Sequence, residues 1–254
     1  MDDRQRLRYS RHLLLDGFGE DSQERLLAAR ALVVGAGGLG SGALLYLASS
    51  GVGRITIADG DAVDLTNLQR QVVHRLDAVG TNKAVSAAAT LATINPEIAV
   101  RAVPERLAPE RIRALAREAD VVLDCSDNFA TRHAINEACV RERVALVSGA
   151  AIRFDGQVAV FDHREPGSGC YHCLFPADAR GDEERCATMG VFAPLVGVIG
   201  TMQAMEAIKL LAGIGETLAG RLLLFDARAQ RWHEVRLSRD PHCAVCGEPR
   251  AAAA

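Results

Sequence analysis

Short apolar runs alternate with longer helical segments between residues 31 and 148 of this 254-residue chain. The runs hold five or six residues and the helical segments ten to fourteen. Apolar runs of this length, separated by helices, are typical of parallel strands that are covered on both faces. The pattern predicts an α/β fold with a Rossmann-like, doubly wound, mostly parallel sheet. We expect strands at Ala31–Gly35, Arg54–Asp59, Ile98–Val103, Val121–Cys125 and Val144–Ser148, and helices at Leu39–Ser50, Thr81–Ile94, Pro109–Glu118 and Asn128–Arg141.

The pattern changes after residue 148. Ala151–Phe154 and Gln157–Phe161 flank Asp155-Gly156, a dipeptide that favours a hairpin turn. A second antiparallel pair is expected closer to the C-terminus, so the C-terminal half should extend the sheet with antiparallel strands. The strands of this pair are expected at Leu222–Phe225 and His233–Leu237.

The first thirty residues predict two helices. Asp21-x-x-Glu24 resembles a capping box before the apolar pair Leu26 and Leu27. The opening residues, Met-Asp-Asp-Arg-Gln, contain no apolar signal region. We therefore expect an N-terminal helical segment and no leader sequence.

Composition favours a soluble cytoplasmic protein. The formal net charge of -3 gives no electrostatic basis for binding nucleic acid or an anionic membrane. The stretch from Ala187 to Met205 has no charged residue and is long enough to span a bilayer. It also contains several glycines and Pro194, so we expect a buried helix preceded by a flexible segment. Unpaired cysteines suit a reducing cytosol.

Two Cys-x-x-Cys pairs stand on either side of that apolar stretch. Four thiolates in two such pairs match the tetrahedral ligand set of structural zinc, which leaves no open position for water. A redox role is the competing hypothesis, but catalytic pairs of this kind usually occur singly. We expect a structural zinc site formed by Cys170, Cys173, Cys243 and Cys246.

A glycine-rich loop follows the first expected strand and opens a helix. Its sequence, Gly35-Ala36-Gly37-Gly38-Leu39-Gly40, fits the G-x-G-x-x-G pattern of nucleotide-binding folds. Asp59 ends the second strand, where a carboxylate can accept hydrogen bonds from a ribose. An NAD-dependent oxidoreductase with a structural zinc explains these residues equally well. The loop glycines with predicted nucleotide contacts are Gly35, Gly37, Gly38 and Gly40.

The charged residues that follow favour a triphosphate. Asn67-Leu68-Gln69-Arg70-Gln71 comes soon after the acid, and Lys83 follows. Arg and Lys neutralise the charge that develops on phosphate during transfer. Asp127, beyond the fourth strand, is a candidate magnesium ligand. Taken alone, Arg70 or Lys83 is better interpreted as a solvated surface charge.

Taken in order, these motifs resemble the MoeB/ThiF/HesA adenylyltransferases, bacterial relatives of ubiquitin-activating enzymes. The resemblance covers almost the whole chain. It implies one adenylation domain over residues 1–254, with N-terminal helices at 1–30, a nucleotide-binding half at 31–148 and a carrier-binding, zinc-bearing half at 149–250. The matching stretches are Arg8–Arg11, Gly35–Gly40, Asn67–Gln71, Asp124–Asn128, Ala193–Lys209 and both cysteine pairs.

The resemblance implies an activity and its partners. Family members use ATP, Mg²⁺ and Zn²⁺ to join AMP to the C-terminal Gly-Gly carboxylate of a ubiquitin-like sulfur carrier, and they release pyrophosphate. They form homodimers. By resemblance, Gly38 contacts the nucleotide, Asp59 the ribose, and Asn67, Arg70 and Lys83 the phosphates; Asp127 ligates magnesium beside Asn128, and Arg11 enters the site of the neighbouring subunit.

Cys186 corresponds to the cysteine that some family members use in a sulfur-linked intermediate. An unused surface cysteine is the alternative, while Cys125 and Cys139 suit the core. The chain shows no rhodanese-like domain, so a cysteine desulfurase or rhodanese is expected to supply sulfur from another chain. Its motifs lean slightly toward ThiF-like enzymes of thiamine synthesis over MoeB-like enzymes of molybdopterin synthesis, and one enzyme could serve both carriers. A zinc-ribbon nucleic-acid binder explains only the cysteines.

Overall fold

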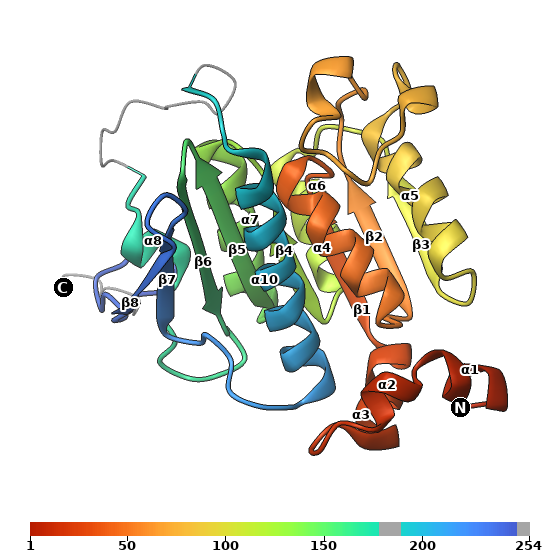
Figure 1. Ribbon diagram of the computed structural model, residues 1–254. Coiled ribbons are helices and arrows are strands. Elements are labelled where there is room, and N and C mark those ends of the chain that lie inside the picture. The colour runs from red at the N-terminus through yellow and green to blue at the C-terminus, as the bar shows by residue number, and fades with distance from the viewer. Residues whose placement is uncertain (178–188, 248–254) are drawn as a thin grey trace.

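A computed structural model describes residues 1–177 and 189–247 (Figure 1). They form an eight-stranded sheet in the order β3-β2-β1-β4-β5-β6-β7-β8. Strands β1 to β5 pair with one another in parallel. Strands β6, β7 and β8 then continue the sheet beyond β5 in antiparallel fashion. The predicted mixed α/β sheet is confirmed. The strands are β1 (Arg30–Val34), β2 (Arg54–Ala58), β3 (Ala99–Val103), β4 (Val121–Asp124), β5 (Ala145–Ile152), β6 (Asp155–Phe161), β7 (Arg221–Asp226) and β8 (Arg231–Arg236).

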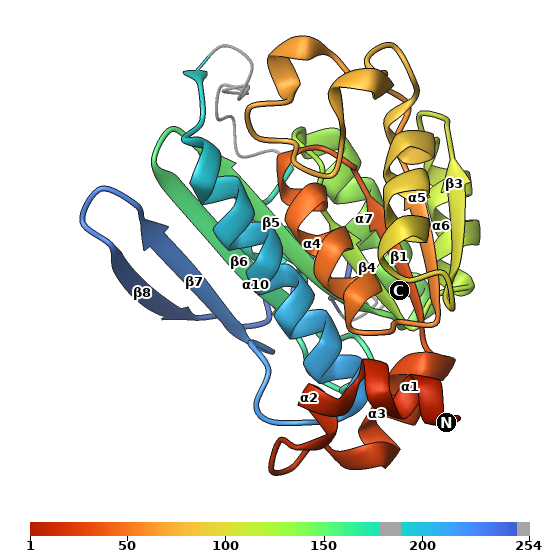
Figure 2. The same cartoon turned by 45° about the vertical axis from the view of Figure 1, so that its right-hand side comes forward.

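Helices cover both faces of the parallel strands (Figures 1 and 2). Residues 31 and 33 of β1 belong to a core shared with α4, α5 and α10, whereas residues 32 and 34 belong to a core shared with α6 and α7. Burial on both faces explains why β1 is apolar at every position after Arg30 and why β4 is apolar up to Asp124. The helices are α1 (Asp3–Arg8), α2 (Ser10–Leu13), α3 (Gly19–Ala28), α4 (Gly38–Ser49), α5 (Lys83–Ile94), α6 (Pro109–Arg117), α7 (Phe129–Glu142), α8 (Tyr171–Leu174) and α10 (Ala193–Ala212), with short 3₁₀ helices η1 (Leu65–Asn67) and η2 (Leu76–Ala78).

Helix α10 accounts for most of the long uncharged stretch. By length and composition alone it could cross a membrane. In the structure it lies against α4, β5 and β6, with Leu195 and Ile199 fully buried in the core (Figure 2). These are the contacts of a core helix, which is the predicted role. The first two residues of the uncharged stretch lie outside the described part of the chain.

The predicted position of the hairpin turn is wrong. Strand β5 continues to Ile152, so the two short strands expected on either side of residue 150 are one strand. The turn is at Arg153-Phe154, where Arg153 has a φ of 51°, and Asp155-Gly156 already belongs to β6. A Cβ on Gly156 would lie 2.7 Å from Ile199 of α10. This glycine therefore allows a helix to pack closely on the sheet, which is a tertiary requirement.

The N-terminal segment also differs from the prediction. It forms three helices, and α3 begins at Gly19, two residues before the expected capping box. The capping box is instead at the start of α1, where the Asp2 side chain accepts from the Gln5 N–H and the Gln5 side chain accepts from the Asp2 N–H. The remaining expected helices and strands are present, with ends shifted by a few residues.

A half-buried histidine after β6 makes stability depend on pH. Burial lowers the pKa of His163 from 6.5 to about 4, and its Nε2 lacks a hydrogen-bond partner among the described residues. Because the folded pKa is below the unfolded one, this group's contribution is fully present above pH ~6.5 and is lost as the pH falls toward 4. The loss is at most about 3 kcal/mol.

We expect His163→Leu to flatten this dependence. Denaturant unfolding of the wild type and the variant at pH 7.5 and pH 4.5 measures the difference between them. His233→Leu, a change at an exposed position on β8, serves as the control and should keep the wild-type loss. The same loss in His163→Leu as in the wild type would contradict the assignment.

Candidate nucleotide-binding site and metal centre

The order of the strands creates a topological switch point between β1 and β4. The chain runs from β1 outward to β2 and β3, then returns to the other side of β1 to form β4. Ligands of open α/β sheets bind at such a switch point, beyond the carboxyl ends of the strands. The glycine-rich loop follows β1 at this point and leads into the N-terminus of α4, where free N–H groups favour an anion (Figure 1).

The glycines of the loop serve different purposes. Gly35 has a φ of 99°, and a Cβ there would lie 2.5 Å from the Cys125 carbonyl oxygen. A Cβ on Gly40 would lie 2.0 Å from the Gly35 oxygen, so these two glycines make the tight turn possible. Gly38 packs against Val196 of α10, and Gly37 caps α4 beside Gln71. The backbone shape of the loop therefore follows from its glycines and the groups packed against them.

Asp59 lies directly beside the loop, as predicted. Its Oδ2 accepts from the Ala36 N–H at 2.8 Å, and its Oδ1 accepts from the Asp61 N–H at 2.8 Å. Each oxygen of an ionised carboxylate can accept a further hydrogen bond. Asp59 therefore holds the loop and keeps acceptor capacity for a ribose.

The segment with Asn67 and Arg70 is anchored to the same loop by two side chains whose role the sequence did not indicate. The first is Gln71, whose side chain packs against Gly37, where a Cβ would lie 3.5 Å from Gln71 Nε2. The buried Oε1 of this side chain has no hydrogen-bond partner in the described part of the chain. The second is His74, whose Nε2 lies 2.8 Å from the Ala36 carbonyl oxygen and whose pKa is lowered by burial. Arg70 makes a 3.4 Å contact with a backbone carbonyl of its own turn. The segment is thus brought to the glycine loop.

Lys83 begins α5 at the far side of Asp59. Its side chain is only 10% exposed, and its Nζ lies 3.3 Å from Asp61 Oδ2. Arg106 contacts the other oxygen of the same carboxylate at 3.0 Å. The Lys83 charge is therefore not a solvated surface charge, which was the alternative interpretation of the sequence.

The loop after β4 carries the candidate magnesium ligand. Asp127 is exposed, while Asn128 caps α7 by accepting from the Thr131 N–H. The nearby Asp124 is fully buried, and its carboxylate accepts from Ser126 and Ser148 and pairs with Arg132 at 3.7 Å. The Asp124 carboxylate is therefore occupied by protein groups, and of the two only the Asp127 carboxylate is open to a ligand.

Arg11 is not brought to the glycine loop within one chain. It is exposed on α2, and Figure 1 shows α1 to α3 at the opposite end of the sheet from the glycine loop. Its neighbour Tyr9 packs against Gly51, just beyond the C-terminus of α4. The twelve-residue α4 begins at the loop and is about 18 Å long. Arg11 can therefore not reach the nucleotide loop of its own chain.

The two cysteine pairs lie close together, away from the glycine loop. The four sulfur atoms lie within 4.8 Å of one another, with separations of 3.9, 3.7 and 3.4 Å for three of the pairs. Zn–S bonds of about 2.3 Å in a tetrahedron place sulfur atoms about 3.8 Å apart. The donor set and its spacing fit a four-coordinate metal. The cluster consists of Cys170, Cys173, Cys243 and Cys246.

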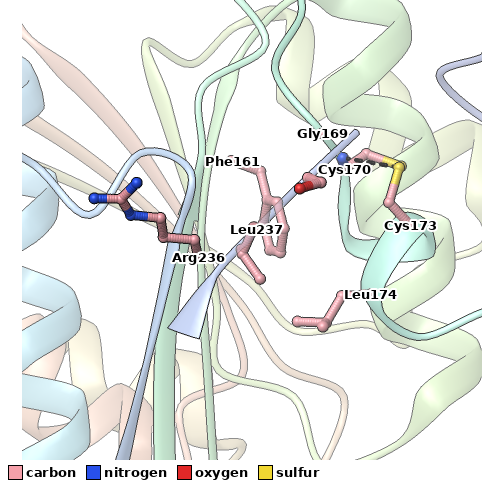
Figure 3. A pocket seen from close by; sticks show the side chains of 8 residues that line it. Phe161, Gly169, Cys170, Cys173, Leu174, Arg236 and Leu237 are labelled. Atoms are coloured by element: carbon pink, nitrogen blue, oxygen red, sulfur yellow. Dashed lines mark hydrogen bonds between the residues drawn. The ribbon is translucent and has the colours of Figure 1, made fainter. Parts of the chain in front are cut away.

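A small cavity adjoins the cysteine cluster (Figure 3). Phe161, Leu174 and Leu237 line its apolar side, and the Arg236 guanidinium points away from the sulfur atoms. The cavity touches none of the predicted nucleotide residues, so it belongs to the edge of the cysteine cluster.

Two cysteines outside the cluster lie in the described part of the chain. Cys125 and Cys139 are buried, and burial raises the pKa of both thiols. The prediction that they are core residues is confirmed. Cys186 lies outside the described residues.

Comparison with known proteins identifies the family. The ThiF family model matches residues 9–245. The molybdopterin-synthase adenylyltransferase of Escherichia coli strain K12 is 47% identical, over 98% of this chain and 99% of that protein. The ThiS adenylyltransferase of the same strain is 45% identical, over 99% of each. The crystal structure of Escherichia coli MccB with ATP has a TM-score of 0.82 and 26% identity, over 94% of this chain and 73% of that one. The resemblance drawn from the motifs is confirmed, and the chain belongs to the ThiF family.

Proposed function

We propose that this protein is an ATP-dependent adenylyltransferase that activates the C-terminal Gly-Gly carboxylate of a ubiquitin-like sulfur carrier. The observation that carries the proposal is the grouping of Asp59, Lys83 and Asp127 around one glycine loop at the switch point of the sheet. The names of the relatives support it, because one is an adenylyltransferase of molybdopterin synthase and another an adenylyltransferase of the sulfur carrier protein ThiS. An NAD-dependent oxidoreductase leaves the cations and the cysteine cluster without a role.

The chemistry needs positioning and charge neutralisation more than a protein nucleophile. A carboxylate is a poor electrophile, and its attack on the α-phosphorus of ATP converts it into a mixed anhydride with AMP while pyrophosphate leaves. Asp59 would hold the ribose, and Asn67, Arg70 and Lys83 would bind the phosphates at the N-terminus of α4. Asp127 would hold Mg²⁺, which neutralises phosphate charge when bound.

The decisive assay is carrier-dependent ATP–pyrophosphate exchange. We expect exchange with a ThiS-like carrier, a MoaD-like carrier or both, each with an intact terminal Gly-Gly. Identities of 47% and 45% to enzymes of the two types do not separate the pathways. Exchange with one carrier would name the pathway, and exchange with both would mark a shared activator. No exchange with either carrier, in protein that binds ATP, would refute the proposal.

Asp127→Ala should lower the exchange rate about a hundredfold or more, because it removes a ligand that stabilises charge in the transition state. Its melting temperature should match the wild type, since Asp127 is exposed. Asp77→Ala, which removes an exposed carboxylate on η2, is the control and should keep full activity. Wild-type exchange in Asp127→Ala would exclude the magnesium assignment.

We also propose that the site is completed by a second copy of the chain. Arg11 is too far from its own nucleotide loop, and Leu7, Leu14 and Leu15 around it expose most of their apolar surface. Isologous contact between two chains would cover this surface and could bring each Arg11 to the partner's site.

Complementation tests this arrangement. Arg11→Ala and Asp127→Ala should each be inactive, whereas a heterodimer of the two, purified with two affinity tags, should regain about half of the wild-type activity. Its one intact site combines Asp127 of one chain with Arg11 of the other. A heterodimer as inactive as its parents would contradict the sharing of Arg11 between chains.

We propose that the cysteine cluster holds a structural zinc ion that ties residues 170–173 to residues 243–246. Asn136 of α7 supports it, because its Oδ1 accepts from the Tyr171 N–H at 2.8 Å and its Nδ2 lies 3.6 Å from Cys170 Sγ. Four thiolates leave no position for substrate, so the metal would stabilise the fold.

Metal analysis and thermal unfolding test the zinc site. We expect a single zinc ion per chain and a melting temperature lowered by more than about 5 °C after chelation. Cys246→Ser should lose the metal, while Cys139→Ala, a control at a buried cysteine outside the cluster, should keep it. Metal-free protein with an unchanged melting curve would overturn the assignment.

The remaining parts of the proposal concern sulfur delivery and cell location. We propose that Cys186 takes part in sulfur transfer and not in adenylylation, and that a cysteine desulfurase or rhodanese supplies the sulfur in trans. Residues 1–254 would act as one adenylation domain in the cytoplasm, with the carrier bound by the half at 149–250.

A further inference from the structure

The carboxylate of Asp61 lies between two cations at the edge of the nucleotide site. Its Oδ2 is 3.3 Å from Lys83 Nζ, and its Oδ1 is 3.0 Å from Arg106 Nη2. A Cβ on Gly60 would lie 2.4 Å from Arg106 Cγ, so the arginine stem lies across this glycine. Burial raises the pKa of Asp61, but the two cations outweigh it and hold the pKa below its ordinary value.

The backbone fixes this carboxylate relative to the rest of the site. The Asp61 N–H donates to Asp59 Oδ1, and the Lys83 N–H donates to the Asp61 carbonyl oxygen, both at 2.8 Å. Asn82 Nδ2 donates to the carbonyl oxygens of Asp59 and Asp61 at 2.9 and 3.1 Å. Asp61 is therefore held between the predicted ribose ligand and the predicted phosphate ligand.

Lys83 and Asp61 differ in exposure. The lysine side chain is 10% exposed and that of the aspartate 50%. An ammonium group that has lost most of its water depends on its counter-ion for its position. An incoming triphosphate offers the same ammonium several further negative oxygens, which compete with the Asp61 carboxylate for it.

We propose that Asp61 is a positioning residue that acts as the counter-ion of Lys83 before ATP binds and gives way in part to nucleotide phosphate. This inference rests on the proposed function, in which Lys83 binds ATP. Asp61 then weakens the binding of ATP in the ground state but keeps Lys83 aligned for the transfer step. Interactions of this kind change turnover and affinity in opposite directions.

Asp61→Asn tests the idea, because it removes the charge and nearly keeps the shape. We expect ATP to bind about threefold tighter while kcat for pyrophosphate exchange falls about tenfold. Damage to the fold would instead weaken both. Glu105→Gln is the matched control, since it removes an exposed ion pair with Arg111 next to Arg106, in the segment that follows β3, and it should change neither constant more than about twofold. Asp61→Ser has the same expected signs and replaces the asparagine variant if that one fails to fold.

A double-mutant cycle shows whether Asp61 acts through Lys83. In a Lys83→Gln background, Asp61→Asn should change the ATP dissociation constant less than about 1.5-fold. An equal effect in both backgrounds, or weaker ATP binding by Asp61→Asn alone, would overturn the inference. ATP binding needs no carrier, so the cycle remains decisive if neither carrier supports exchange, which would refute the proposed function alone. Wild-type protein that does not bind ATP would overturn both.

Discussion

The buried carboxylate of Asp124 is the interaction on which the geometry of the site depends. It ends β4 at the switch point and is enclosed by Ser126, Ser148 and Arg132. Arg132 in turn donates to the carbonyl oxygens of Ser126 and Gly149 at 2.6 and 2.9 Å. Removing one partner of a buried, hydrogen-bonded ion pair typically costs about 3–5 kcal/mol, because the other charge is left uncompensated. The network joins β4, β5 and α7, and it fixes the direction of the exposed loop that carries Asp127.

Helix α7 connects this network to the cysteine cluster. Its first turn is capped by Asn128 next to Asp127, and its third turn carries Asn136, which contacts Cys170 and Tyr171. The helix is thus held at its start by the half-buried Asn128 and near its middle by the buried Asn136. In the proposed function, the zinc site would therefore hold α7, and with it the loop of Asp127, in one position without contacting the nucleotide.

The sequence predicted most of the sheet because strands buried on both faces and helices of ordinary length follow from local patterns alone. It failed where a tertiary contact decides the outcome. Gly156 looks like a turn residue, but it lies in β6 because Ile199 of α10 packs against its backbone. Gln71 and His74 were not assigned a role, since neither residue type signals contact with the glycine loop. Asp61 was not assigned a role either, because its importance comes from Lys83 and Arg106, which are far away in sequence.

Arg11 shows a further limit of what one chain can reveal. Its motif was recognisable in the sequence, yet the fold places it at the far end of α4, about 18 Å from the loop by the length of that helix. An arginine side chain is much shorter than this separation. Either Arg11 is a surface charge, or the functional unit contains more than one chain. The apolar side chains exposed beside it favour the second interpretation, because an isolated chain gains nothing by leaving Leu7 and Leu14 about three-quarters exposed to water.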